Sequence, residues 1–357
     1  MGACVTNSKN SHHPGALMRA EAISAPDRIA AQLRANGQAY ADLATLLRAR
    51  PPAFAVTVAR GSSSHAAGYA RALFETALGL VTAPAAPSAV TLYGARLRLK
   101  DSLVLAISQS GESPDLVTVV ERARADGALT LALVNEVDSP LAQAAEHCLA
   151  LHAGPERSVA ATKSFLCSLS AAASLVAAWK PDAELETALT TLPDRLREAA
   201  ACDWSAALPI LRDARSLLVV GRGYGFPVAQ EMATKLKETC TLHAEALSAA
   251  DLLHGPVALV HDGLPVLLVA LPDATLPGVL ELARRLRGQG AHLLVASPVA
   301  EALDLAHTPL PLPAPLHPML DPLAAAQAFY PLAADAALAR GLDPDRPPSL
   351  SKVTRTV

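Results

Sequence analysis

The stretch LVLAISQSGESPDLVTVVERARADGALTLALV, from Leu103 to Val134, decides the fold. It begins with a short apolar run and continues through a polar loop into an amphipathic helical pattern. A second apolar run follows Gly127. Short apolar runs that alternate with helical patterns are typical of β-α-β units, whose strands lie parallel. The stretch therefore predicts part of an α/β fold.

The same unit recurs later in the chain. VLLVALPDATLPGVLELARRLRGQGAHLLVA starts at Val266, and its helix-ending Gly290 lies 163 residues (290 − 127) after Gly127. AFAVTVARGSSSHAAGYARALFE, from Ala53, and SLLVVGRGYGFPVAQEMATKLKE, from Ser216, also share one strand–loop–helix pattern. We therefore expect two tandem copies of one domain, each a parallel sheet flanked by helices. The expected segments are a disordered leader (1–17), an N-terminal domain (18–195), a C-terminal domain (196–345) and a tail (346–357).

Composition and charge exclude several classes of protein. Of 357 residues, 51% are hydrophobic, which is enough apolar material for two buried cores. A net charge of -3 and an aromatic content of 3% argue against a nucleic-acid partner. No apolar run is long enough for a membrane span, and the first residues lack a signal peptide. The five cysteines show no CxxC spacing, so we expect neither disulfides nor a metal site, and a cytoplasmic location.

The loop SQSGES, residues 108–113, is the most informative loop of the first copy. Ser113 is a good N-cap, and Pro114 suits the first position of a helix. Hydroxyl and backbone N–H groups at a helix N-terminus suit a dianion, although an ordinary polar turn is the alternative. No Walker lysine is present, so a sugar phosphate fits better than a nucleoside triphosphate.

A second group of hydroxyls follows another strand, in ARGSSSHAAG, where Ser62, Ser63 and Ser64 are consecutive. Ligands of open α/β sheets gather at the carboxyl ends of strands, so both loops can face one ligand. The second copy has ALPDATLP in place of AISQSGESP and so lacks the hydroxyls. This difference predicts one phosphate site per chain.

The candidate chemistry lies in QEMATKLKETC, residues 230–240. On a helix, Glu231, Lys235 and Glu238 share one face, at i, i+4 and i+7. Such a face is either a solvated row of ion pairs or a catalytic row with a tuned carboxylate. His254 precedes Gly255-Pro256, a turn signal that places it at a helix end.

These segments resemble a known family. GSSS, SQSGES and VAATKSF are similar to the SIS (sugar isomerase) fold. EMATKLKETCTLHAEALSAADLLHGPVAL and LSKVTRTV resemble the isomerase half of glutamine–fructose-6-phosphate amidotransferase. The resemblance covers nearly everything from Met18 to Val357 and implies two tandem SIS domains of flavodoxin-like α/β architecture. That enzyme has an additional glutaminase domain whose nucleophile is a cysteine directly after the initiator Met. This chain begins Met1-Gly2-Ala3-Cys4, so we expect no such domain here.

The resemblance implies a role for each matching residue. Glu238 corresponds to the carboxylate that shuttles a proton between C1 and C2, and Glu231 and Lys235 match an active-site pair on the same helix. His254 corresponds to a histidine that assists ring opening from the neighbouring subunit, and Lys352 to a lysine that forms a Schiff base with the ketose. The expected substrate contacts are Ser62, Ser63, Ser108, Gln109, Ser110, Ser113 and the backbone of Val159.

The expected activity follows from this set. Moving a proton between adjacent carbons needs a positioned base, and neither a metal nor pyridoxal phosphate is required. Without a glutaminase domain, we expect a deaminase in a homodimer that converts glucosamine 6-phosphate and water to fructose 6-phosphate and ammonia. Alternatives are a deaminase or deglycase for galactosamine 6-phosphate or fructosamine 6-phosphate, and a sugar-phosphate sensor without catalysis. A sensor has no need of Glu238, His254 and Lys352 together.

Overall fold

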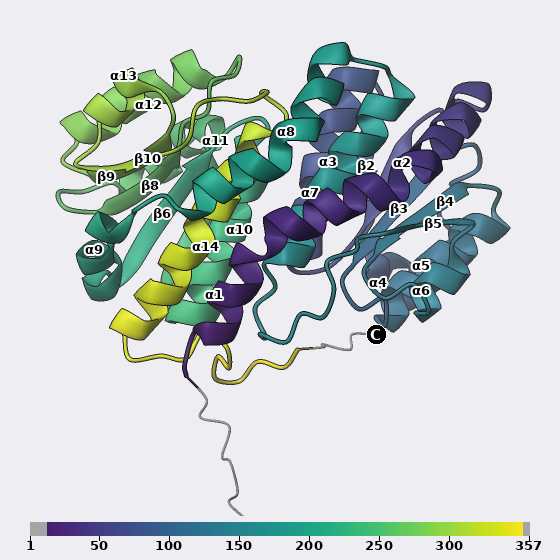
Figure 1. Cartoon of the computed structure of the whole chain (residues 1–357), viewed down its shortest axis with the longest axis horizontal. Helices are drawn as coiled ribbons and strands as arrows, with labels where there is room; N and C mark the ends of the chain where they lie inside the picture. Colours follow the sequence, from purple (N-terminus) through teal and green to yellow (C-terminus); the bar gives the residue numbers. More distant parts are fainter. Residues whose placement is uncertain (1–12, 353–357) are drawn as a thin grey trace, which may run out of the picture.

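The computed structural model describes residues 13–352. They contain two five-stranded sheets, in which every pair of neighbouring strands is parallel (Figure 1). The first sheet has the order β2-β1-β3-β4-β5 and comprises β1 (Ala55–Val58), β2 (Thr82–Pro84), β3 (Leu103–Ser108), β4 (Leu129–Val134) and β5 (His147–Ala150). The second has the order β10-β9-β8-β6-β7 and comprises β6 (Ser216–Gly221), β7 (His243–Ser248), β8 (Pro265–Val269), β9 (His292–Ser297) and β10 (Thr308–Pro311). The predicted fold class is confirmed.

The strands are apolar because the sheets are covered on both faces. Every residue of β3 and β4 is buried, as expected for parallel strands with helices on either side. In each sheet the first strand pairs with the second on one side and with the third on the other. The strand order therefore reverses between β1 and β3, and again between β6 and β8. Loops that leave the carboxyl ends of strands at such a reversal diverge and open a crevice for a ligand.

Two sets of helices surround the sheets (Figure 1). Those that belong to the first repeat are α3 (Ser62–Leu78), α4 (Pro87–Thr91), α5 (Pro114–Ala125), α6 (Pro140–Ala144) and α7 (Lys163–Trp179). Those of the second repeat are α9 (Leu208–Asp213), α10 (Gly225–Cys240), α11 (Ala249–Leu253), α12 (Leu276–Gly288) and α13 (Ala300–Asp304), with 3-10 turns η1 (Ser205–Ala207) and η2 (Pro256–Leu259). Helices α3 and α10 pack against each other. The hydroxyl-rich segment at the start of α3 and the charged face of α10 therefore belong to neighbouring helices.

Four further helices lie outside the two repeats. They are α1 (Ala16–Ile23), α2 (Ala25–Ala49), α8 (Ala183–Ala200) and α14 (Asp321–Ala339). Helix α14 packs against α10, α8, α9 and α1. The domain boundary predicted between residues 195 and 196 lies within α8, a helix that packs on both α14 and α2.

One hydrophobic core runs through the middle of the molecule, and each sheet has a second core on its outer face. The central core contains Leu105 of β3, Val219 of β6 and Phe329 of α14. The outer core of the first sheet includes Val104, and the outer core of the second includes Val266. The inner faces of both sheets therefore share one apolar interior, which fixes α3 and α10 relative to each other.

The segment after α14 returns to the first half of the chain (Figure 1). The buried carboxylate of Asp345 accepts hydrogen bonds from Leu17 N at 3.0 Å and Met18 N at 2.7 Å. Its carbonyl accepts from Val159 N at 3.2 Å. These bonds bring the predicted tail beside the loop that precedes α7.

Three sequence predictions concern the chain ends and the membrane. Most of the predicted leader, residues 1–17, lies outside the described residues, and α1 begins at Ala16. The predicted tail is described as far as Lys352. Within residues 13–352, no helix has the length and apolar character that crossing a bilayer requires.

Candidate active site

The loop after β3 is built tightly around Gly111. The Ser108 hydroxyl accepts a hydrogen bond from Gly111 N at 3.0 Å. Gly111 has φ 65°, and a Cβ at this position would lie 2.1 Å from the Ser139 hydroxyl. A side chain is therefore excluded by both backbone conformation and space. The loop holds its serines in one arrangement at the reversal of strand order.

Helix α5 begins where the sequence predicts, with Ser113 at the N-cap and Pro114 as its first residue. The Ser113 side chain makes no capping hydrogen bond, so its hydroxyl can turn to a ligand. A cavity of 360 Å³ opens here, which we call the serine cavity. Its lining comprises Arg60, Gly61, Ser63, Ile107, Ser108, Gln109, Ser110, Ser113, Leu116 and Lys352.

The three charged residues of α10 form a connected row. Lys235 Nζ lies 3.6 Å from Glu231 Oε1 and forms an ion pair with Glu238 Oε2. The side chains of Lys235 and Glu231 are each 1% exposed, whereas that of Glu238 is 29% exposed. A solvated row would expose all three. Only Glu238 reaches the surface of the site, while the other two form its buried support.

A second cavity of 190 Å³, the acid–lysine cavity, joins this row to the serine loops. Its lining comprises Arg60, Ser62, Ser63, Gln109, Val159, Ala161, Ser164, Phe165, Lys235, Glu238, Leu350, Ser351 and Lys352. Four residues, Arg60, Ser63, Gln109 and Lys352, line both cavities. The two spaces therefore adjoin, and together they gather every predicted substrate contact beside Glu238.

Burial sets the protonation of Glu231. Burial raises the pKa of Glu231 to about 7, against the attraction of Lys235, while the negative charge of Glu238 adds to the rise. The hydroxyl of Tyr330, on α14, donates to Glu231 Oε1 at 3.3 Å. Burial opposes the charge of Lys235, but the two carboxylates raise its pKa above the ordinary value. The ammonium is thus retained beside the partly exposed carboxylate of Glu238.

The pKa of Glu231 predicts how stability depends on pH. The pKa of its carboxyl is 4.5 in a solvated chain and about 7 in the folded protein. Between these values the folded state holds a proton that the unfolded state has lost, so stability falls as pH rises. We expect a decrease of about 2 to 3 kcal/mol in unfolding free energy between about pH 5 and 7. Urea unfolding of Glu231→Gln should lack this decrease, and the same slope in both proteins would contradict it.

Lys352 is held by a residue that the sequence did not single out. Its Nζ donates to Ser158 O at 2.7 Å and lies 3.4 Å from Glu156 Oε2. Glu156 is buried and also accepts from Ser164 Oγ at 2.7 Å and from Thr162 N at 3.0 Å. Burial favours the neutral acid, but Lys352 and these hydrogen bonds lower the pKa of Glu156 below its ordinary value. The carboxylate is an anchor for the lysine of the tail.

His254 stands apart from these residues. It caps the C-terminus of α11, as the turn signal predicts, and its side chain is exposed. It does not line either the serine cavity or the acid–lysine cavity. Within one chain, the structure therefore brings together every predicted site residue except His254.

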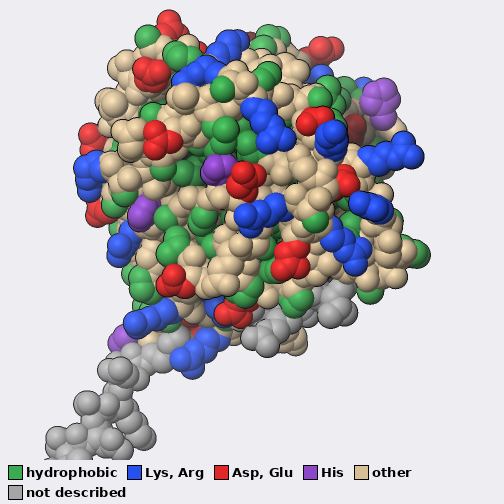
Figure 2. Space-filling model, turned by 90° about the vertical axis from the view of Figure 1, so that its right-hand side faces the viewer, with side chains coloured by type: hydrophobic (Ala, Val, Ile, Leu, Met, Phe, Trp, Pro, Cys, Tyr) green, Lys and Arg blue, Asp and Glu red, His purple; other side chains and the backbone are tan. Residues whose placement is uncertain are grey.

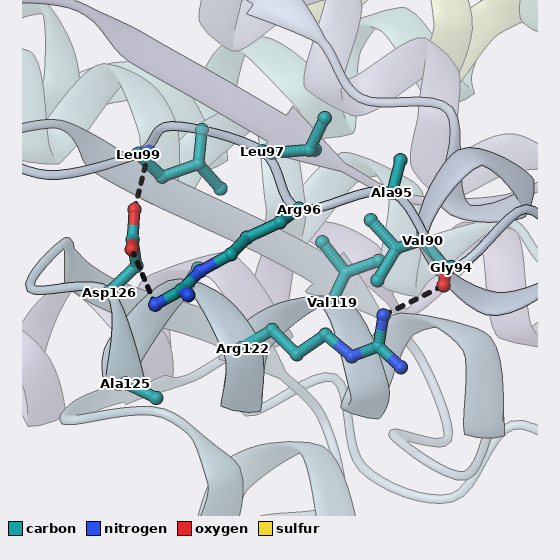
Figure 3. A pocket seen from close by; sticks show the side chains of 11 residues that line it. Val90, Gly94, Ala95, Arg96, Leu97, Leu99, Val119, Arg122, Ala125 and Asp126 are labelled. Carbon is teal, nitrogen blue, oxygen red and sulfur yellow. Dashed lines mark hydrogen bonds and ion pairs between the residues drawn. The ribbon is translucent and has the colours of Figure 1, made fainter.

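A separate cavity of 390 Å³ lies on the outer side of the first sheet, between α4, α5 and the loop that joins α4 to β3 (Figure 3). Arg122 Nη1 donates to Val90 O at 2.8 Å, and Arg96 lies 3.7 Å from the carboxylate of Asp126. Its basic groups are thus already engaged by the protein. None of the predicted site residues lines it.

Surface charge and possible metal ligands are two further features of the described residues. Figure 2 shows basic and acidic side chains interspersed over one face of the molecule, without a broad field of a single sign there. Among residues 13–352, no three His, Cys, Asp or Glu side chains are grouped as a metal site would require. The charged groups of the cavities are the lysine, arginine and carboxylate side chains already described.

Comparison with known proteins gives a family and several relatives. Residues 54–178 and 210–300 match the family described as SIS domain. The glutamine–fructose-6-phosphate aminotransferase (isomerizing) of Aeropyrum pernix is 34% identical over 313 residues, covering 83% of this chain and 50% of that protein. The chain thus spans about half the length of this relative.

Solved structures share the whole architecture. A putative phosphosugar isomerase from Silicibacter pomeroyi has a TM-score of 0.84 and 41% identity, with 93% of this chain and 100% of that chain covered. A glucosamine-6-phosphate deaminase from Thermotoga maritima has a TM-score of 0.72 and covers 95% of this chain and 100% of its own. At 21% identity, the latter likeness shows the fold alone.

Proposed function

This chain belongs to the SIS domain family, and we propose that it is an amino-sugar-phosphate deaminase acting on glucosamine 6-phosphate. One observation carries the proposal: the partly exposed carboxylate of Glu238, paired with buried Lys235, lines the space that serine loops and Lys352 also line. A base, an anion cradle and an amine in one cavity suit proton transfer within a phosphorylated sugar.

The proposed first step is an isomerisation. The sugar phosphate lies with its phosphate at the serine loops and its C1–C2 end at Glu238. Glu238 removes the C2 proton of the open-chain 2-amino aldose and returns it to C1. The amino group loses a proton and the C1 oxygen gains one, so the aldehyde becomes a hydroxymethyl group and the amine becomes an imine at C2. Lys235 holds the carboxylate of Glu238 in place through their ion pair.

The proposed second step releases ammonia. Water adds to the C2 imine, the C–N bond breaks, and ammonia leaves together with fructose 6-phosphate. The resemblance to the amidotransferase implies a Schiff base between this lysine and the ketose, and we propose that capacity for Lys352. That role requires the lysine to lose a proton and leave Glu156, since a neutral amine is the nucleophile.

We also propose that the enzyme is a homodimer in which His254 completes the site of the partner subunit. The residue is exposed on its own chain, and its neighbours Leu253 and Leu259 are 41% and 55% exposed. Exposed apolar side chains grouped around a polar residue are typical of a surface that another protein covers.

The direct test is ammonia release from glucosamine 6-phosphate. The purified chain, treated with a chelator and supplied with neither glutamine nor pyridoxal phosphate, should form ammonia and fructose 6-phosphate in equal amounts. Galactosamine 6-phosphate and fructosamine 6-phosphate serve as competing substrates, and unphosphorylated glucosamine serves as the control. Tight binding of these phosphates with no turnover of any of them would favour a sensor instead.

A further inference from the structure

Arg60 is a charged residue that the proposed mechanism leaves without a role. It lies two residues after the end of β1 and directly before Gly61, at the reversal of strand order. Its side chain is 46% exposed. It lines both the serine cavity and the acid–lysine cavity, as do Ser63 and Gln109. A guanidinium group therefore borders the space where the serine hydroxyls gather.

Asp115 holds one edge of this guanidinium. Arg60 Nε and Nη2 donate to Asp115 Oδ2 at 2.9 and 2.8 Å, and the Asp115 side chain is fully buried in the first turn of α5. The Nε–Nη2 edge is thus occupied, whereas Nη1 makes no hydrogen bond to any residue from 13 to 352. A planar guanidinium fixed along one edge presents its other donors in a defined direction.

The charges in the cavity indicate which ligand group the remaining N–H donors of Arg60 would bind. A phosphate ester carries a charge of about −1.5 to −2 at neutral pH. The serine hydroxyls and backbone N–H groups offer only dipoles, and Lys352 is engaged by Glu156. We propose that Arg60 binds the phosphate group of the substrate, with Asp115 as the residue that orients it, an inference that rests on the proposed function. Arginine suits this task because its fork matches the geometry of phosphate oxygens.

The competing explanation is purely structural. The pair could serve only to tie the loop after β1 to the N-terminus of α5, in which case its removal would alter stability and leave affinity unchanged. Arg60→Ala alone is a poor test, because it takes the ion pair with Arg60 away from the buried carboxylate of Asp115. Arg60→Ala combined with Asp115→Asn removes both charges and avoids this defect.

The experiment measures binding rather than turnover. Calorimetric titration with fructose 6-phosphate, and separately with inorganic phosphate, should give a Kd about 10- to 100-fold weaker in the double variant. Arg71→Ala is the matched control, since Arg71 is 50% exposed and paired with Glu75 but lines neither cavity. Its Kd should stay within about twofold of the wild type. Circular dichroism confirms that each variant is folded.

Each outcome of the binding experiment either supports or overturns the proposed role of Arg60. A folded double variant with wild-type affinity overturns the role of Arg60 and leaves the deaminase proposal intact. If the double variant binds more weakly and the wild type releases no ammonia, the phosphate role of Arg60 is supported and the deaminase proposal is wrong. Wild-type protein that binds neither probe removes both. Should the double variant unfold, Arg60→Lys decides: it keeps a cation beside Asp115 but loses the second edge, so binding should weaken about tenfold.

Discussion

Glu238→Gln is expected to lower kcat for ammonia release by about 10²- to 10⁴-fold, the usual contribution of a positioned acid–base group. Fructose 6-phosphate affinity should change little, because the amide has the same shape and the phosphate contacts are elsewhere. Stopped assays at saturating glucosamine 6-phosphate, together with calorimetric titration, measure the two quantities.

The size of this effect follows from the arrangement on α10. Glu238 is the partly exposed member of a row whose other two side chains are buried. In the variant, Lys235 keeps Glu231 at 3.6 Å, so the ammonium retains one carboxylate and the helix should remain folded. The Gln amide oxygen can still accept a hydrogen bond from Lys235, but it cannot take up a proton.

Glu281→Gln provides the matched control. Glu281 is an exposed glutamate on α12 and lines neither cavity, so the same chemical change there should leave kcat within about twofold. If Glu238→Gln lost less than about tenfold at saturating substrate, a different group would move the proton. The assignment of the row on α10 would then be wrong, whereas the sugar-phosphate contacts would be unaffected.

Much of the fold is predictable because it rests on local patterns. The alternation of apolar runs and amphipathic helices in residues 103–134 and 266–296 corresponds to β3–α5–β4 and β8–α12–β9. The i, i+4, i+7 spacing of Glu231, Lys235 and Glu238 predicts a shared face, and the ion pairs on α10 confirm that. In both cases one segment carries the whole signal, so a single sequence suffices.

Glu156 and Arg60 were missed for the opposite reason. Glu156 meets Lys352 across 196 positions of sequence, from a segment without regular structure. A lone glutamate there has no periodicity and no motif to mark it. Arg60 stands in a loop without periodicity, and its pairing with Asp115 appears only when β1 and α5 are placed together. Contacts of this kind depend on tertiary packing.

His254 raises a different question, because the residue was predicted but does not join its own chain's cavities. Its position at the end of α11, followed by η2 with no buried residue, leaves this segment uncovered in one chain. A two-fold dimer would place the same segment of each subunit near the other by symmetry. The proposed sharing of His254 can therefore be tested without a structure of the dimer.

Mixing two inactive variants, His254→Ala and Glu238→Gln, should restore activity if His254 acts in the partner's site. Each mixed dimer would then hold one site with both defects and one with neither. Random exchange at equal amounts makes about half of the dimers mixed, so roughly a quarter of all sites become wild-type. Ammonia release should recover to about that fraction of the wild-type rate, from a level near zero.

The mixing experiment distinguishes the two arrangements, because action of His254 within its own chain predicts no recovery of activity. If His254 acts within its own chain, both sites of a mixed dimer carry one defect, and the activity stays at that of the separate variants. Differently tagged chains, co-purified after mixing, show that exchange has taken place. A second mixture, His254→Ala with Lys352→Met, should recover to the same quarter, since Lys352 and Glu238 line one cavity of one chain. A third mixture, Lys352→Met with Glu238→Gln, should show no recovery, because both residues line the same cavity of one chain. Recovery in this mixture would mean that the two residues serve different sites.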